Sequence, residues 1–383
     1  MKIIVTGGGT GGHIYPAIAI ADELKRRHPD AEILYVGTEQ GMEADFVPRA
    51  GYPIRFIHSA GFDRKHLVRN ARTVATMLRG ETEARAILHE FRPDFVIGTG
   101  GYVSLPMLRV AQFEKIPTFI HEQNAFAGVA NKLVSKGTRC VLVAFEAARD
   151  RFPDAPSVEV VGNPVRAEFV TADRNACRAA IGVAEDEFML LCFGGSLGAM
   201  MINRTFSEAL PRILAHESDR KMRVFYATGK MYYDEYGRKL AGQGIATCTY
   251  DEMLAGSPER VVLMPYIHNM FGLLPAADLV VSRAGALTCA EITVSGRASV
   301  MIPSPNVTEN HQYYNAKAIA DRNGCTLLEE KELNAGTLAD RILELRNDAE
   351  LRRRMEAAAK SVSVPDSAER IVRAIEAHLP DKR

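Results

Sequence analysis

The stretch Lys2-Ile-Ile-Val-Thr-Gly-Gly-Gly-Thr-Gly-Gly-His13 opens the chain and decides the fold. Its apolar start predicts a buried strand, and its five glycines predict a tight turn whose backbone N–H groups no side chain covers. A helix expected from Tyr15-Pro16 onward would point its positive end at this turn, which suits a diphosphate. Gly7 to Gly12 also fit G-x-G-x-x-G, so a dinucleotide site is one interpretation, and close packing of strand on helix is another.

Length and composition indicate a globular protein of two domains, since the chain has 383 residues, 47% hydrophobic and 25% charged. The formal net charge is zero, which argues against general nucleic-acid binding. The six cysteines form no C-x-x-C pair, so we expect reduced thiols in a cytoplasmic protein and no zinc or other metal site. The first apolar run is too short for a signal peptide, and no stretch approaches the ~20 apolar residues of a membrane span. If the protein meets a membrane, it lies on the surface.

Strand-like and helix-like segments alternate throughout, which predicts parallel sheets with helices on both faces. We expect two similar doubly wound α/β domains, at 1–163 and 164–365, facing each other across a cleft. A last helix at about 366–383 is a candidate to pack back on the first domain. The expected strands are 2–6, 33–36, 54–57, 95–98, 118–121, 140–143 and 158–161 in the first half, and 188–193, 224–227, 261–264, 279–282 and 299–302 in the second.

Four loops of small residues each follow an expected strand. Ligands of open α/β sheets bind at the carboxyl ends of the strands, so four such loops favour a phosphate-bearing ligand. The loops are 7–13, 98–104, 194–198 and 282–291.

The type of nucleotide is indicated by two carboxylates. A nicotinamide site wants an acidic residue at the end of the second strand, but that strand ends in Gly37-Thr38, with Glu39 only after it. Glu291 lies one helical turn beyond the fourth loop, where a carboxylate can accept both ribose hydroxyls. The alternative is that Glu291 only favours the dipole of its helix.

At this point the chain resembles a known family, the bacterial N-acetylglucosaminyltransferases of peptidoglycan synthesis, over nearly its whole length. Some relatives carry serine where this chain has Ala284, and Gln-Gln where it has His311-Gln312. The matching stretches, in order, are Gly8-Gly-Thr-Gly-Gly-His13, Gly100-Gly-Tyr-Val-Ser104, His121-Glu-Gln-Asn124, Gly162-Asn-Pro-Val-Arg166, Gly194-Gly-Ser196, Arg283-Ala-Gly-Ala-Leu-Thr288 with Glu291, and His311-Gln312 with Asn315-Ala316.

The resemblance implies a GT-B fold and an inverting transferase that needs no metal or other cofactor. It would move GlcNAc from UDP-GlcNAc to the muramyl 4-hydroxyl of lipid I, the undecaprenyl-pyrophosphoryl-MurNAc-pentapeptide, and give lipid II. It further implies a peripheral protein on the cytoplasmic face of the plasma membrane, with other cell-wall synthesis proteins as possible partners. The resemblance also implies roles for single residues: Thr10, Gly11 and Gly12 approach the substrates, and Asn124 lies near the reacting sugars. The residues that it implies for binding of the donor are Arg166, Ser196, Ile267, Ala286, Leu287, Thr288, Cys289, Ala290, Glu291 and Gln312.

Inversion at an anomeric carbon needs a base on the attacking hydroxyl and relief of charge on the leaving diphosphate. Backbone N–H groups of 194–198, Arg166 and Ser196 are the expected source of that relief. His13 is the expected base, because histidine ordinarily titrates at about pH 6.5. Alternatively His13 only orders its loop or binds acceptor phosphate. Glu122 is the other candidate base, unless it is a carboxylate paired inside the first domain.

A basic amphipathic segment at 62–79 is a candidate for contact with anionic lipid, where each cation contributes about 1 kcal/mol. The alternative is a solvated helix face. Its cations are Arg64, Lys65, Arg69, Arg72 and Arg79.

Three rival functions remain at this stage. They are a UDP-GlcNAc epimerase of similar fold, an NAD-dependent oxidoreductase, and a sugar-nucleotide sensor without turnover. Release of UDP with and without a lipid I analogue separates them.

Overall fold

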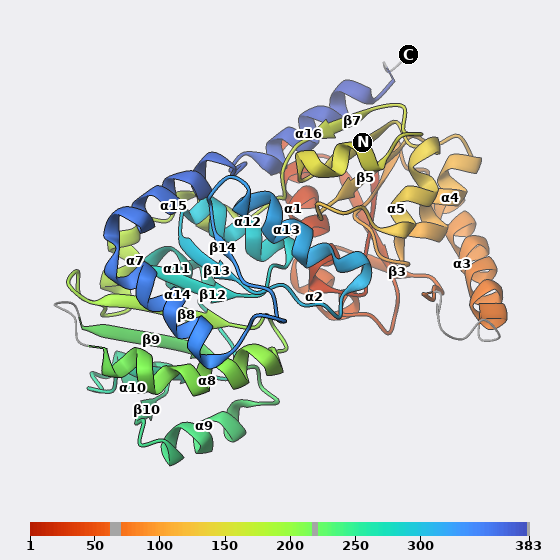
Figure 1. The fold of residues 1–383 in the computed structure, drawn as a ribbon. Helices are drawn as coiled ribbons and strands as arrows, with labels where there is room; N and C mark the ends of the chain where they lie inside the picture. Colours follow the sequence, from red (N-terminus) through yellow and green to blue (C-terminus); the bar gives the residue numbers. More distant parts are fainter. Residues whose placement is uncertain (62–69, 217–220, 381–383) are drawn as a thin grey trace. The chain divides into compact units, whose positions relative to one another are not determined.

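The computed structural model describes residues 1–61, 70–216 and 221–380, except for the side chains of 70–72 and 308 (Figure 1). The chain divides into two compact units, one formed by 1–165 with 364–383 and the other by 166–363. The boundary at 165 lies two residues beyond the 163 expected from sequence. Each unit is described by itself.

Unit 1 is built on seven parallel strands in the order β3-β2-β1-β4-β5-β6-β7. Its central strand β1 pairs with β2 on one side and β4 on the other, and Ile4 lies opposite Leu34 and Val96. Ile3 and Ile4 are both fully buried, because helices cover both faces of the sheet. The elements are β1 Lys2–Thr6, α1 Gly11–Arg27, β2 Glu32–Gly37, α2 Glu43–Arg49, β3 Ile54–Phe56, α3 Asn70–Phe91, β4 Phe95–Gly98, α4 Ser104–Phe113, β5 Thr118–Glu122, α5 Val129–Val134, β6 Cys140–Val143, β7 Val158–Val160 and α16 Ser367–His378.

The last helix, α16, belongs to unit 1. Ile371 and Ile375 are fully buried and join the apolar cluster that contains Ile14 of α1. The Ser367 hydroxyl donates to the carbonyl of Asn163 at 2.6 Å and fixes the start of the helix. The end of the chain therefore completes the first core.

Unit 2 repeats the plan with seven parallel strands in the order β10-β11-β9-β8-β12-β13-β14. The predicted class, two doubly wound parallel α/β domains, is confirmed. The elements are α6 Ala167–Thr171, α7 Arg174–Ala180, β8 Phe188–Phe193, α8 Met200–Ala215, β9 Met222–Ala227, α9 Tyr233–Gly242, β10 Thr247–Cys248, α10 Tyr250–Leu254, β11 Val261–Met264, α11 Met270–Ala276, β12 Leu279–Ser282, α12 Ala286–Ser295, β13 Ala298–Met301, α13 His311–Ala320, β14 Thr326–Leu327, α14 Ala335–Asn347 and α15 Ala349–Ser361.

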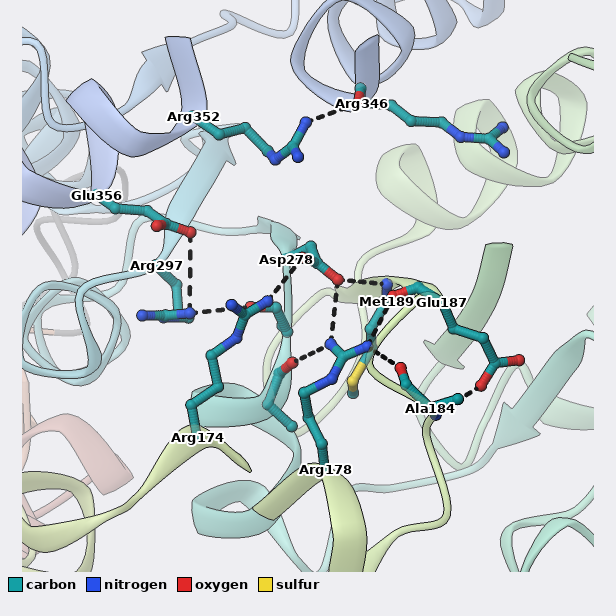
Figure 2. Close-up of polar contacts among 12 residues, drawn as sticks. Arg174, Arg178, Ala184, Glu187, Met189, Asp278, Arg297, Arg346, Arg352 and Glu356 are labelled. Atoms are coloured by element: carbon teal, nitrogen blue, oxygen red, sulfur yellow. Dashed lines mark hydrogen bonds and ion pairs between the residues drawn. The ribbon is translucent and has the colours of Figure 1, made fainter. Parts of the chain in front are cut away.

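A buried arginine network fastens α7 to the start of β12 (Figure 2). The Arg178 side chain is only 4% exposed and pairs with Asp278 at 3.1 Å. Asp278 also accepts a bond from Arg174 at 2.6 Å and one from the Met189 N–H at 2.8 Å. Other Arg178 donors meet the backbone carbonyls of Ala184, Glu187 and Ala276. A guanidinium that is paired and hydrogen-bonded is the form in which a charge is tolerated in a protein core.

Candidate active site

The four small-residue loops lie at the topological switch points of the two sheets. In unit 1 the chain winds from β1 to β2 and β3 on one side and continues from β4 on the other, so loops 7–13 and 98–104 follow the two strands at the reversal. In unit 2 the reversal falls between β8 and β12, which precede loops 194–198 and 282–291. Ligands of doubly wound sheets bind at such reversals.

In unit 1 the two loops touch backbone to backbone, and only glycine fits there. A Cβ on Gly101, whose φ is +77°, would lie 2.4 Å from the carbonyl oxygen of Gly8. A Cβ on Gly7 would lie 2.0 Å from the Thr99 hydroxyl. Close packing therefore explains Gly7 and Gly101, whereas a role of the loop in ligand binding stays a prediction.

The helices that follow these loops begin without a side-chain cap. In the described structure α1, α8 and α12 have neither a capping side chain nor an acidic residue in the first turn. Asp173, Thr249, Asn334 and Asp348 cap the starts of α7, α10, α14 and α15. Helix starts without a side-chain cap or an acidic first turn, placed at the switch points, suit an anion such as a diphosphate. Thr10, Gly12 and Ser196 are exposed there, and Gly11 is half-buried.

His13 is half-buried in the first turn of α1. Its Nδ1 lies 3.0 Å from the carbonyl oxygen of Thr99 and 3.1 Å from Oε1 of Gln123. Both oxygens accept hydrogen bonds, so Nδ1 carries the proton and Nε2 of the neutral ring keeps its lone pair. This is the tautomer that a general base needs.

Glu122 is only 1% exposed, and its carboxylate is already occupied by four donors. Oε1 accepts from the backbone and side-chain nitrogens of Asn124 at 3.0 and 3.2 Å. Oε2 accepts from the Gly128 N–H and from Nδ2 of Asn131, each at 2.9 Å. Both oxygens are thus already engaged in hydrogen bonds within the first unit. The geometry favours Glu122 as an organiser of the 124–131 loop.

Glu43 organises the first glycine loop and was missed by the sequence analysis. It is fully buried and accepts from the Gly9 N–H at 3.1 Å and from the Thr38 N–H at 3.0 Å. A Cβ on Gly8 would lie 2.4 Å from its Oε1. A glutamate 34 residues from its partner gives no local signal in the sequence.

In unit 2, Glu291 is the sixth residue of α12, past the first turn, so the helix-dipole interpretation is weakened. Burial raises the pKa of its carboxyl to about 7, and the charge of Arg166 opposes that shift. The Arg166 guanidinium lies 5.3 Å from the ring centre of Phe169 and 5.6 Å from that of Phe271. Arg166 and Glu291 therefore belong to one local environment.

The other residues predicted to bind the sugar-nucleotide donor differ in their contacts and burial. The Cys289 thiol is buried beside the Met301 sulfur, 3.8 Å away, so only its backbone is available to a ligand. Oε1 of Gln312 accepts from the Ser304 N–H at 2.9 Å. Ile267 and Ala286 are buried, and Leu287, Thr288 and Ala290 are half-buried.

The approach to α13 is strained. Glu309 and Asn310 both adopt positive φ, at 55° and 51°, just before His311. Left-handed non-glycine residues cost free energy and concentrate at ligand sites. Asn315, fully buried, donates to the carbonyl of Ala284 at 3.2 Å and so ties α13 to the fourth loop.

Of the predicted membrane-facing cations, Arg64, Lys65 and Arg69 lie outside the described residues, and only the backbone of Arg72 is described. Arg79 is exposed on α3 and pairs with Glu83 at 3.1 Å. Val74 and Leu78 on the same helix are 46% and 59% exposed. Among the described helices none is long and apolar enough to cross a membrane.

One group of three potential metal ligands occurs among the described residues, Cys140, Glu159 and His378 in unit 1. His378 Nδ1 lies 2.9 Å from the Ala374 carbonyl and 3.5 Å from the Glu159 carboxylate. The hydrogen bond to Ala374 and the polar contact with Glu159 explain this arrangement. None of the three is a predicted site residue.

Comparison with known proteins agrees with this geometry. The glycosyltransferase family 28 N-terminal domain matches residues 3–143, and the family's C-terminal domain matches residues 189–371. A protein of Bacillus cytotoxicus named UDP-N-acetylglucosamine–N-acetylmuramyl-(pentapeptide) pyrophosphoryl-undecaprenol N-acetylglucosamine transferase is 41% identical over 371 residues, 97% of each chain.

Solved structures give the same picture. Acinetobacter baumannii MurG superposes with a TM-score of 0.76 at 26% identity, covering 98% of this chain and 99% of that one. A putative UDP-N-acetylglucosamine 2-epimerase of Listeria monocytogenes superposes with a TM-score of 0.70 at 14% identity, covering 100% of this chain and 97% of that one. The second likeness shows the fold alone.

Proposed function

This chain belongs to glycosyltransferase family 28, and from that premise we propose that it transfers GlcNAc from UDP-GlcNAc to the muramyl 4-hydroxyl of lipid I, giving lipid II and UDP. The main support for this proposal is the Bacillus cytotoxicus protein named for that transfer, which is 41% identical to this chain over 97% of both chains. The epimerase alternative is supported only by a likeness of fold at 14% identity. The oxidoreductase alternative lacks an acidic residue at the end of β2, where Gly37 closes the strand.

The donor is assigned to unit 2. The N–H groups at the start of α8, which no side chain caps, stabilise together with Ser196 and Arg166 the charge that develops on the departing diphosphate. The Glu291 carboxylate accepts the ribose hydroxyls, and Gln312 from α13 contacts the sugar. These groups replace the metal ion that many transferases use, so we propose a reaction without metal or other cofactor.

The acceptor is assigned to the loops of unit 1. Nε2 of His13 takes the proton of the muramyl 4-hydroxyl while that oxygen attacks the anomeric carbon of GlcNAc. The bond from that carbon to the UDP oxygen breaks, UDP leaves with the bonding pair, and the configuration inverts. Asn124, held by Glu122, lies on the loop that would adjoin the reacting sugars.

The acceptor's lipid tail implies that the enzyme works at a membrane surface. The exposed Val74 and Leu78 of α3, next to a basic segment, support peripheral attachment to anionic lipid at the cytoplasmic face.

The test is UDP release from UDP-GlcNAc with and without a soluble lipid I analogue, with the disaccharide product identified by mass. Release that requires the analogue is the expected result. An epimer of UDP-GlcNAc formed without acceptor, or an absorbance change with NADH alone, would overturn the proposal.

A further inference from the structure

We propose that Gln123 is a positioning residue that fixes the tautomer of His13, as the middle member of a hydrogen-bond relay from the Gly162 carbonyl through His121 and Gln123 to His13. The catalytic part of this inference rests on the proposed function, in which His13 is the base. The structural part stands on the geometry of unit 1.

The relay starts at a group whose direction is fixed. Nε2 of His121 lies 3.0 Å from the carbonyl oxygen of Gly162, which can only accept, so Nε2 carries a proton. His121 is fully buried, and burial lowers the pKa of its imidazole to about 4. The ring is therefore neutral at physiological pH, and its Nδ1 is an acceptor.

That acceptor sets the orientation of the Gln123 amide. Nε2 of Gln123 lies 2.9 Å from Nδ1 of His121 and 3.0 Å from the carbonyl oxygen of the same residue. Both partners need a donor, so the NH₂ end of the amide must face His121. Gln123 is 1% exposed, so water does not substitute for these partners. The amide oxygen is left pointing the other way, 3.1 Å from Nδ1 of His13.

The far end of the relay is fixed as well. Nδ1 of His13 also lies 3.0 Å from the Thr99 carbonyl oxygen. Reversing the relay would set lone pair against lone pair at Gly162 and at Thr99, so only one direction satisfies every member. In that direction His13 holds its proton on Nδ1 and presents a bare Nε2. His121 holds the opposite tautomer, with its proton on Nε2.

The carboxylate next in sequence does not replace the relay. The charge of Glu122 raises the pKa of His121, but the Glu122 oxygens are occupied by Asn124, Gly128 and Asn131. An amide suits the central position because it offers a donor at one end and an acceptor at the other. Methionine has a similar length and offers neither strong donor nor strong acceptor.

The first experiment needs no variant and no activity. Nitrogen NMR of protein labelled at histidine, recorded at pH 8, reports which ring nitrogen is protonated, and His13→Gln and His121→Gln assign the signals. We expect His13 protonated at Nδ1 and His121 at Nε2. A wild-type His13 protonated at Nε2 would overturn the proposal, whatever reaction the enzyme catalyses.

The second experiment is kinetic. Gln123→Met should lower kcat by roughly 10–100-fold with the donor KM unchanged, and should shift the His13 signals toward a mixture of tautomers. Gln112→Met is the matched control, because Gln112 is a half-buried glutamine of unit 1 that bonds to Thr118 and the Val134 carbonyl and makes no contact with the relay. Unchanged kcat and unchanged His13 signals in Gln123→Met would refute the role. Should that variant fail to fold, Gln123→Asn, too short to reach both histidines, takes its place with the same expected results.

Discussion

Burial favours the protonated form of Glu291, whereas the expected contact with ribose hydroxyls favours the carboxylate. Its folded pKa of about 7 exceeds the ordinary value of 4.5, so the folded, unliganded protein holds a proton that the unfolded chain releases. Stability contributed by this group is present below pH 4.5 and is lost as the pH rises through 7. Glu291→Gln should therefore be more stable than wild type at pH 8, by roughly 1–3 kcal/mol. The two proteins should converge at pH 4.5, as measured by thermal unfolding over that range.

The same variant should bind UDP more weakly, because an uncharged amide is a poorer acceptor for ribose hydroxyls. Wild-type affinity should rise from pH 6 to pH 8 as the carboxylate forms, and the variant should show no such rise by calorimetry. A variant that gains stability without losing affinity would mean that Glu291 does not touch the nucleotide.

The base assignment is tested by comparing His13 with Glu122. His13→Ala should lower kcat by about 10²–10⁴-fold, the usual contribution of a general base, and leave UDP affinity nearly unchanged. Glu122→Gln should mainly destabilise unit 1, since an amide NH₂ would face donors from Asn124, Gly128 and Asn131. If a well-folded Glu122→Gln protein is inactive while His13→Ala loses only a few-fold, the base is Glu122.

Residues with local motifs were predictable, and residues with remote partners were not. His13 and Glu291 follow small-residue loops and could be named from sequence. Glu43 and Gln123 act on residues 34 and 110 positions away, so their contacts could not be read from the chain, although Gln123 lies within the matching stretch 121–124. Hydrogen-bond relays appear only once the strands are placed side by side.

At the scale of elements, the α7–β12 junction depends on one buried ion pair. Arg178→Met should destabilise the protein by about 3–5 kcal/mol, because Asp278 is 6% exposed and would lose its buried partner. Arg174→Met is the control, since Arg174 pairs with the same carboxylate but is 36% exposed, and it should cost less. Urea unfolding followed by circular dichroism measures both. Equal losses of stability in the two variants would show that the greater burial of Arg178 does not increase its contribution.

The basic segment 62–79 is tested by reversing its charge. Replacing Arg69, Arg72 and Arg79 with glutamate should weaken binding to vesicles of anionic lipid at least tenfold, since each cation contributes about 1 kcal/mol. Turnover of a soluble acceptor analogue should be retained. The matched control reverses three exposed arginines of unit 2, Arg212, Arg341 and Arg353. Equal vesicle binding by both triple variants would place the lipid-binding surface elsewhere.

Strands of three or more residues were predictable, including the edge strands β3 and β7, whereas the two-residue edge strands β10 and β14 were not. β8 is a run of six buried residues followed by a glycine turn, a pattern typical of a central parallel strand. β10 and β14 have two residues each and are defined by pairing with β11 and β13 rather than by composition. An element that short carries no periodicity to detect.

For the whole molecule, the sequence predicted two doubly wound sheets because the strand, glycine turn and helix of the first half recur in the second. The place of α16 did not follow from its amphipathic pattern, which says that one face is buried but not against what. That partner is the cluster around Ile14, at the opposite end of the chain.

The last prediction concerns the whole catalyst, namely that its activity survives EDTA. We assign the anionic leaving group to the uncapped start of α8 and to Arg166, which stabilise charge as a divalent cation would but are not removed by a chelator. The one candidate ligand group among the described residues includes Cys140, the first residue of β6. This group therefore lies toward the amino-terminal edge of a parallel sheet whose candidate ligand loops follow the carboxyl ends, and a thiol is a poor ligand for Mg²⁺.

We expect UDP release to be equal before and after treatment with EDTA, and Cys140→Ser to behave as wild type under both conditions. A loss of activity restored by Mg²⁺ or Mn²⁺ in both proteins would reveal a catalytic metal held elsewhere, whereas a loss restored by Zn²⁺ only in wild type would make the Cys140 group a structural metal site.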